Sequence, residues 1–346
     1  MMQFTLLIPT YGRPALLRRL LHYYENKSFQ YPIIIADSSD TTAFGENRET
    51  ISHCRACNVE HHSFDPSIEF FEKVVRALKT VDTPYVSLCA DDDFIASRSI
   101  TRSVEFLTKH PSYSAAQGRS FTVEISDDRR LRVVAYPQHA IKGVDAKTRL
   151  ESYFENPSAN FYAIYRTAVL KEIMEHISRN RTDNTRFEEL AVSSLGAISG
   201  NIAVLPTLHM VRQSSRKRAD SGSRQTGSWV AVMESPAFTT NKERFLELIT
   251  EALVEGGIER PAARQRIQTC FDIYLGQAQG NMPRPQRITL LDRLVALSLS
   301  PIATTKPRTL AVHLLRHIPF VRTLRSEFLP IAQLISQHPN GIETAP

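Results

Sequence analysis

The most informative segment of the chain is Tyr85-Val86-Ser87-Leu88-Cys89-Ala90-Asp91-Asp92-Asp93-Phe94. In it, a short apolar run with strand-forming residues leads directly into three consecutive carboxylates, and the chain then becomes apolar again. Carboxylates this close repel one another unless a cation or hydrogen-bond donors compensate their charge. At the end of a buried strand, the compensating group is commonly a hard divalent cation held by oxygen ligands. Taken alone, the segment fits a solvated acidic turn equally well.

The residues around this segment alternate between strand-like and helix-like patterns. Unbroken apolar strands that alternate with amphipathic helices predict an α/β fold whose mostly parallel sheet is covered on both faces. The predicted strands span 4–8, 32–36, 58–62 and 85–89, and the predicted helices between them include 16–24 and 68–78.

Three of the predicted strands end in polar groups that can bind a ligand. The first strand is followed by Thr10 and Arg13, the second by Asp37 and Ser38, and the fourth by the acidic triplet 91–93. Ligands of parallel α/β sheets collect at the carboxyl ends of the strands. The coincidence of three such ends favours a binding site over an acidic turn.

The remaining chain predicts further elements and a domain boundary. The pattern predicts a hairpin around Asp127-Asp128, a strand at 161–166, a helix at 186–198 and a last buried strand at 202–205. Residues 213–227 are rich in Ser, Arg and Gly and predict a loop or linker. We therefore expect a catalytic domain at 1–215, and a basic loop followed by a helical region at 216–346.

Composition places the chain among ordinary globular proteins. It has 346 residues, a hydrophobic fraction of 42% and a formal net charge of +6. Four cysteines are too few for a disulfide framework in a chain of this length. The sequence shows neither a signal peptide nor an apolar stretch of about 18 residues. We therefore expect a cytoplasmic protein.

The predicted elements resemble, in order and spacing, the nucleotide-sugar-binding half of GT-A glycosyltransferases, and in particular the inverting, family-two-like bacterial enzymes. The resemblance covers about residues 3–215 and rests on four segments taken together. These are an opening strand and loop at 7–13, a second strand with an acidic end at 34–40, the aspartate-rich motif at 85–94 and the acidic pair at 187–190.

The resemblance implies a divalent cation, Mg²⁺ or Mn²⁺, that bridges the diphosphate of a nucleotide-sugar donor. Asp92 and Asp93 are the expected ligands, and Asp91 is expected near the ribose or a bound water. The family's usual first aspartate falls on Ala90, so which carboxylates bind the ion stays open. His209 either completes this metal or diphosphate site or is a structural histidine.

Other residues are expected to hold the nucleotide. Asp37 would accept hydrogen bonds from the nucleobase or ribose, with Thr10 and Arg13 lining the same pocket. The remaining expected contacts are Pro9 and Ser38 in that pocket, and Arg212 and Arg216 on a loop that closes over the diphosphate. A solvated basic loop explains the two arginines equally well.

For the catalytic base, Glu189 is the first candidate and Glu188 the second. On helical spacing, Glu189 lies away from the packed face and so could face a cleft. The family more often has Glu-Asp where this chain has Glu-Glu. Asn160, Tyr162 and Tyr165 are candidates for contacts with a glycan or lipid-linked glycan acceptor.

The segment 308–335 is basic and amphipathic. Such a segment lies on an anionic membrane face, packs on the catalytic domain, or forms a contact between copies of the chain. Pro319 and Pro330 predict that it is divided into short helices. A membrane contact would make the enzyme peripheral on the inner face of the membrane.

Alternative functions fit the sequence less well. A nucleotidyltransferase commonly has a glycine-rich phosphate loop after the first strand, and this chain has only Gly12 there. A nucleic-acid-binding role lacks exposed aromatic residues among the basic ones. A catalytically degenerate sugar- or nucleotide-binding protein stays open. A zinc site at Cys54 and Cys57 is disfavoured because no second Cys pair accompanies them.

Overall fold

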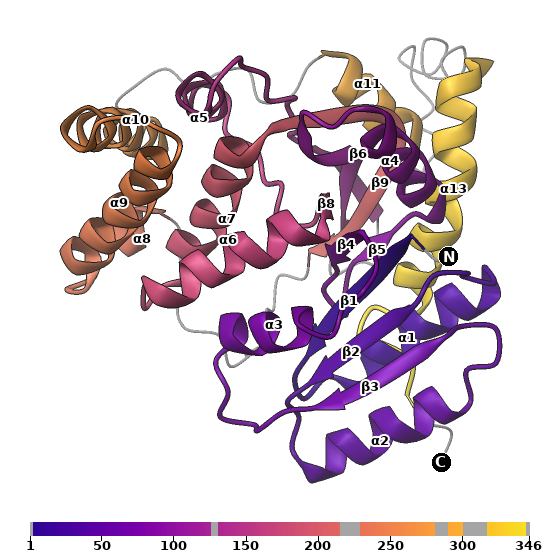
Figure 1. Cartoon of the computed structure of the whole chain (residues 1–346). Coiled ribbons are helices and arrows are strands. Elements are labelled where there is room, and N and C mark those ends of the chain that lie inside the picture. Colours follow the sequence, from indigo (N-terminus) through magenta and orange to yellow (C-terminus); the bar gives the residue numbers. More distant parts are fainter. Residues whose placement is uncertain (1–2, 126–130, 215–228, 281–289, 300–316, 344–346) are drawn as a thin grey trace.

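A computed structural model describes residues 3–125, 131–214, 229–280, 290–299 and 317–343 of the chain. Its centre is a nine-stranded sheet with helices on both faces (Figure 1). The strand order is β3-β2-β1-β4-β8-β6-β9-β5, and β7 pairs with β6 outside this path. The α/β class predicted from the sequence is confirmed.

The first four strands of this order are parallel. They are β1 (Phe4–Thr10), β2 (Ile33–Asp37), β3 (Val59–Ser63) and β4 (Tyr85–Leu88). Their carboxyl ends therefore meet at one edge of the sheet, where Thr10 pairs in register with Asp37.

The second half of the sheet is mixed. It contains β8 (Ile164–Arg166), β6 (Tyr113–Ile125), β9 (Asn201–Ser214) and the short β5 (Phe94–Ile95), with β7 (Leu131–Tyr136) at the side. Only β6 and β9 run parallel here; β4–β8, β6–β8, β6–β7 and β5–β9 are antiparallel. The antiparallel β6–β7 pair agrees with the predicted hairpin, whose turn residues lie outside the described ones.

Alternation along β1 divides the helices between the two faces of the sheet. Leu7 contributes to a core formed with α3 (Phe70–Leu78), α5 (Ala146–Glu155), α6 (Thr167–Arg179) and α7 (Thr185–Ser199). Leu6 and Ile8 point the other way, toward α1 (Pro14–Asn26) and α4 (Ser97–Lys109). This period of two is the expected behaviour of a strand buried on both faces.

Helices after β9 extend both cores. On the first face lie α8 (Trp229–Met233), α9 (Phe238–Glu255) and α10 (Arg260–Gln279), beside α7. On the second face, α11 (Leu290–Leu299) and α13 (Pro319–Gln337) pack near β7, β6 and β9 (Figure 1). None of the helices in the described residues combines the length and apolar character needed to cross a bilayer.

The apolar face of α13 is buried against the protein. Val321, Leu324 and Phe328 are at most 1% exposed, and Phe328 contacts Phe121 of β6 edge to face. This supports the packing interpretation for the described part of the segment 308–335; residues 300–316 lie outside the described ones. The predicted break at Pro330 is wrong: α13 continues through it, because the exposed proline lies on the outer face while its neighbours Phe328 and Ile331 stay packed.

Two other predictions need correction, and one helix was not predicted. The last strand, β9, does not end at Leu205 but continues to Ser214. Its pairing with β6 shifts register around the exposed Pro206, which has no N–H to donate to the ladder. The strand predicted at 161–166 is regular only over Ile164–Arg166. Helix α2 (Thr41–Ser52) has only Ala43 and Asn47 buried, so its sequence shows no apolar face.

Candidate active site

The acidic triplet forms the connection between β4 and β5. Cys89 N–H donates to the carbonyl of Leu7 at 2.9 Å, so the pairing with β1 persists up to the turn. The turn is closed by Asp93 N–H, which donates to the carbonyl of Ala90 at 3.2 Å. The three carboxylates thus lie at the carboxyl edge of the sheet, beside the end of β1, as the sequence predicted.

Asp91 is fully buried and is held from the β1 side. Thr10 Oγ1 donates to Asp91 Oδ2 at 2.7 Å, and Arg13 forms an ion pair with the same carboxylate. Burial raises the pKa of Asp91 to about 6, against the opposing effect of the Arg13 charge. Thr10 and Arg13, which the sequence placed in the nucleotide pocket with Asp37, thus contact the triplet and stabilise its first carboxylate.

Asp93 is also buried but is held from the opposite side, by β9. Arg212 Nε lies 3.2 Å from Asp93 Oδ2, and the N–H of Gln213 donates to Oδ1 at 3.1 Å. The register explains the meeting, because Phe94 of β5 pairs with Val211 and places Asp93 beside Arg212. Burial raises the pKa of Asp93 to about 7, whereas Arg212 opposes that rise.

Arg212 is therefore a strand residue and not part of a closing loop, which corrects the prediction. Burial alone would lower its pKa, but the charge of Asp93 outweighs burial and raises the pKa above its usual value. Its guanidinium also lies over the ring of Tyr136, 5.1 Å from the centroid. Arg216, the other predicted diphosphate contact, lies outside the described residues.

Asp92 is the accessible carboxylate of the triplet. Its side chain is 33% exposed and forms an ion pair with Arg13, at 3.3 Å from Nη1 to Oδ2. The carboxylates of Asp91 and Asp93 are at most 3% exposed. A ligand that approaches from solvent therefore meets Asp92 first.

Asp37 is enclosed by its own chain. Its carboxylate accepts from Ser39 N–H at 2.8 Å and from Asn47 Nδ2 at 2.8 Å, and His61 Nε2 lies 2.9 Å away. Burial would raise the pKa of Asp37, but these hydrogen bonds outweigh it and lower the pKa. With no exposed surface, this carboxylate fixes the turn from β2 to α2, and the predicted contact with the nucleobase does not fit this arrangement.

Lys73 of α3 ties the ends of the first two strands together. Its buried ammonium donates to the carbonyl of Thr10 and to Ser38 Oγ, both at 2.8 Å. Burial lowers the pKa of Lys73 to about 8. Ser38 is thus engaged by the protein, while Pro9, inside β1, is buried and in register with Ala36.

We expect Lys73→Met to lower the free energy of unfolding by about 1–3 kcal/mol, because a buried carbonyl and a hydroxyl lose their donor. Urea unfolding followed by circular dichroism measures the change. Lys79→Met is the matched control, since Lys79 is exposed just beyond the same helix, and it should change stability by less than about 0.5 kcal/mol.

The stability difference between wild type and Lys73→Met should also widen as the pH rises. The pKa of Lys73 in the folded protein, about 8, lies below the value near 10.5 of an unfolded lysine. Between these two values the unfolded chain binds more protons, so wild-type stability rises with pH. A pH-independent difference would show that Lys73 keeps an ordinary pKa.

A cavity of about 100 Å³ opens between α7, β6 and β9, next to Arg212. Glu189 is exposed and lines this cavity together with Tyr162 and Arg212. Because Arg212 also contacts Asp93, one guanidinium connects the acidic triplet to the space in front of Glu189. The cavity is lined by Gln117, Tyr136, Ala159, Phe161, Tyr162, Arg186, Glu189, Ser193, Met210 and Arg212.

Glu188 points into the protein instead. It is 6% exposed, and its Oε1 lies 3.8 Å from Nε of Arg181. Of the two candidate bases, Glu189 is therefore the one that borders a cavity. Asn160 and Tyr165 bond to each other in the core, at 3.0 Å, so of the three acceptor candidates only Tyr162 lines the cavity.

His209 does not suit a metal ligand. It is 1% exposed, with Nδ1 2.9 Å from Ser99 Oγ and Nε2 2.9 Å from the carbonyl of Tyr162. Nε2 must therefore carry the proton, and Nδ1 accepts from the serine. Burial lowers the pKa of His209 to about 4, so the ring is neutral. Of the two roles left open, the structure favours the structural one.

Two positioning side chains were not anticipated, although both leave a trace in the sequence. Lys73 and Arg19 each interrupt the apolar face of a helix, next to Val74 and to Leu20. A long cation on a buried face needs acceptors in the interior. The pattern predicts that such partners exist, but not which residues supply them.

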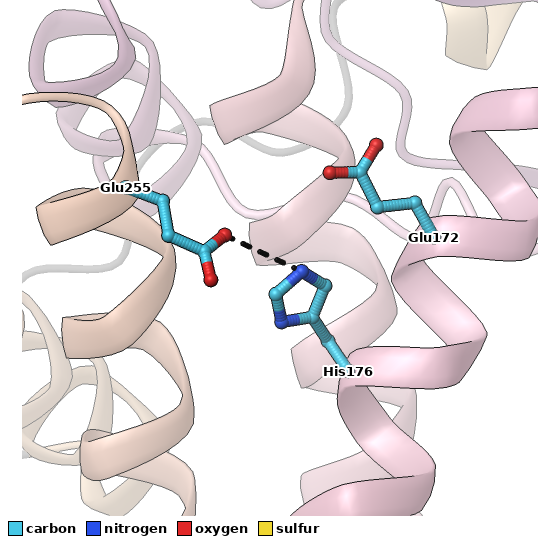
Figure 2. Close-up of side chains that lie close together, drawn as sticks. All are labelled: Glu172, His176 and Glu255. Carbon is cyan, nitrogen blue, oxygen red and sulfur yellow. Dashed lines mark ion pairs between the residues drawn. The ribbon is translucent and has the colours of Figure 1, made fainter.

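Two further groups of ligand-type side chains lie elsewhere in the described residues. Glu172, His176 and Glu255 point toward one another from α6 and α9, and His176 Nε2 lies 3.5 Å from Glu255 (Figure 2). Both glutamates are exposed, and an ion pair between helices accounts for the group. Cys54 and Cys57 are free thiols and belong to no such cluster of three ligands.

Comparisons of sequence find no match, either to a protein-family model or to a curated protein. Comparisons of structure find solved proteins with a similar fold. Residues 1–349 of S. aureus TarS in complex with UDP-GlcNAc match with a TM-score of 0.54 at 15% identity, over 99% of this chain and 93% of that one. The same region in complex with UDP matches with a TM-score of 0.52 at 13% identity, over 97% and 90%.

The chain has a GT-A fold. The alignment with TarS covers nearly the whole of both chains, and the arrangement of β1 to β4 with the acidic turn is the one the sequence predicted. At this identity the likeness establishes the GT-A fold alone. The chemistry has to be argued from the side chains.

Proposed function

We propose that this protein is an inverting, metal-dependent glycosyltransferase that moves a sugar from a nucleotide-sugar donor to a hydroxyl of a glycan or glycolipid, in the synthesis of bacterial surface polysaccharide. The observation that carries the proposal is the chain of contacts from Asp93 through Arg212 to the cavity lined by Glu189. It supplies a site for a leaving diphosphate next to a site for a base. The GT-A fold supports the same conclusion.

The transfer needs a proton acceptor and stabilisation of a leaving group. Glu189 would take the proton of the acceptor hydroxyl as its oxygen attacks the anomeric carbon. The bond from that carbon to the diphosphate breaks, and its electron pair leaves with the phosphate oxygen. Arg212 and Arg13 lie beside the triplet and offer fixed positive charge near the developing negative charge.

The triplet fits a hard divalent cation. Its donors are all carboxylate oxygens, which Mg²⁺ and Mn²⁺ prefer. Burial also keeps the pKa values of Asp91 and Asp93 raised, at about 6 and about 7, despite two adjacent arginines. The carboxylates can therefore accept more positive charge than the chain provides.

Asp92 would hold the ion through its partly exposed carboxylate, and Asp93, which accepts from Arg212 and Gln213, would join it through its remaining lone pairs. When bound, the ion would neutralise charge on the departing diphosphate. The choice between Mg²⁺ and Mn²⁺ does not follow from this geometry. Arg13, paired with Asp92, would have to move or share that carboxylate.

Release of nucleoside diphosphate tests the proposal. The wild type should release it from at least one of a panel of UDP-, GDP- and dTDP-sugars when Mn²⁺ or Mg²⁺ and an acceptor glycan are present, and EDTA should stop the release. The stereochemistry of the product, read by NMR, tests inversion. Binding of a nucleoside diphosphate without turnover of any donor would instead support a catalytically degenerate relative.

A further inference from the structure

The segment His338–Glu343, here called the C-terminal strap, is hydrogen-bonded to α1. Ile342 N–H donates to the carbonyl of Ala15 at 2.9 Å, and Arg18 Nη1 donates to the carbonyl of Ile342 at 2.7 Å. Gly341 lies at φ +98°, and a Cβ at this position would collide with the backbone of Ala15. The strap therefore approaches α1 as closely as only glycine allows.

The strap also reaches the acidic triplet through two side chains. Arg19, fully buried in α1, donates to the carbonyl of His338 at 2.8 Å, to Gln213 Oε1 at 2.6 Å and to the carbonyl of Asp92 at 3.3 Å. Gln213 in turn donates from Nε2 to the carbonyl of Pro339 at 2.7 Å, and from its backbone N–H to Asp93. Both paths run from the strap to the loop that carries the carboxylates.

Arg19 is poorly compensated without the strap. Burial lowers its pKa to about 10, and among the described residues its Nε has no hydrogen-bond partner. Its guanidinium lies over the ring of Phe94, 5.2 Å from the centroid, directly after the triplet. Loss of the His338 carbonyl would leave one more buried N–H of Arg19 unpaired, and the guanidinium would shift to find another acceptor.

We propose that the strap, Arg19 and Gln213 form a positioning device that holds the acidic loop in the conformation required for donor binding. The inference rests on the proposed function for its effect on the donor. The coupling itself, from the strap to the loop, depends only on the contacts described above. Neither Arg19 nor Gln213 needs to touch the substrate.

Gly341→Ala tests the device without altering any residue near the triplet. We expect faster hydrogen exchange in residues 338–343 and also in the acidic loop, 89–95, and an approximately tenfold rise in the Kd of UDP measured with Mn²⁺. Gly257→Ala is the matched control. Gly257 also has a positive φ, of +88°, but nothing lies within 4 Å of its added Cβ, so its loop exchange and Kd should equal those of wild type.

Faster hydrogen exchange in residues 338–343 together with unchanged exchange in residues 89–95 would overturn the inference. If Gly341→Ala fails to fold, the variant Arg18→Gln takes its place in the same measurements, because it removes the hydrogen bond to the carbonyl of Ile342. If the wild type binds no nucleoside diphosphate, the proposed function fails, whereas the exchange data still decide whether strap and loop are coupled. If exchange in residues 89–95 becomes faster but the Kd of UDP is unchanged, the strap affects the conformation of the acidic loop only, and its proposed role in donor binding is contradicted.

Discussion

Glu189→Gln should reduce kcat by about 10²- to 10⁴-fold, the usual contribution of a general base, while the Kd of the nucleotide donor stays within about twofold. The amide keeps the size of the side chain but cannot accept the proton of the acceptor hydroxyl. Glu189 lines the cavity together with Arg212 and Tyr162, and Arg212 also contacts Asp93. Steady-state kinetics of diphosphate release and calorimetric titration with UDP separate the two effects.

Glu188→Gln is the matched control, because it makes the same chemical change one residue away. Glu188 is buried near Arg181, so its loss should lower stability and leave kcat within a few-fold of wild type. The reverse result, with a large loss in Glu188→Gln and normal turnover in Glu189→Gln, would assign the base to Glu188. Equal activity of both variants would remove the acidic pair from the chemistry.

The sequence predicted the parallel half of the sheet well because each strand there is a local apolar run that ends in a polar turn. Ile33–Asp37 and Tyr85–Leu88 are found close to their predicted ranges. β9 was predicted too short because its pattern is interrupted by Pro206 and ends in Arg212 and Gln213. Only the pairing with β5 and β6 shows that these polar residues still belong to a strand.

The sequence could predict which residue types gather at the candidate site, but not which side chains contact one another there. The triplet, Thr10 and Arg13 come together because parallel strands align their ends. The contact between Asp93 and Arg212 depends on an antiparallel register between residues more than a hundred positions apart. Asp37 was expected to bind the nucleotide, and the role of His209 was left open between a ligand and a structural histidine. Residue type alone could not decide either case, and the folded protein satisfies both side chains internally.

Asp93→Asn should weaken binding of UDP with Mn²⁺ by about 100-fold and lower the free energy of unfolding by about 1–2 kcal/mol, less than for a fully buried ion pair. The second effect follows because the guanidinium of Arg212, whose side chain is 31% exposed, loses its buried counter-charge and faces an amide instead. The first follows because the carboxylate is lost from the triplet and Arg212 is displaced. Calorimetric titration measures the binding, and urea unfolding measures the stability.

Two variants separate these causes. Asp92→Asn changes a partly exposed carboxylate, so it should weaken Mn²⁺-dependent binding yet change stability by less than about 1 kcal/mol. In the double variant Asp93→Asn with Arg212→Met, the unpaired charge is removed. The double variant should therefore lose less unfolding free energy than the two single variants lose when their losses are added, which is the signature of direct coupling. Its donor binding should stay weak. If Asp93→Asn binds UDP with a normal response to Mn²⁺, Asp93 is not a ligand of the ion, and its part is to hold Arg212 in place.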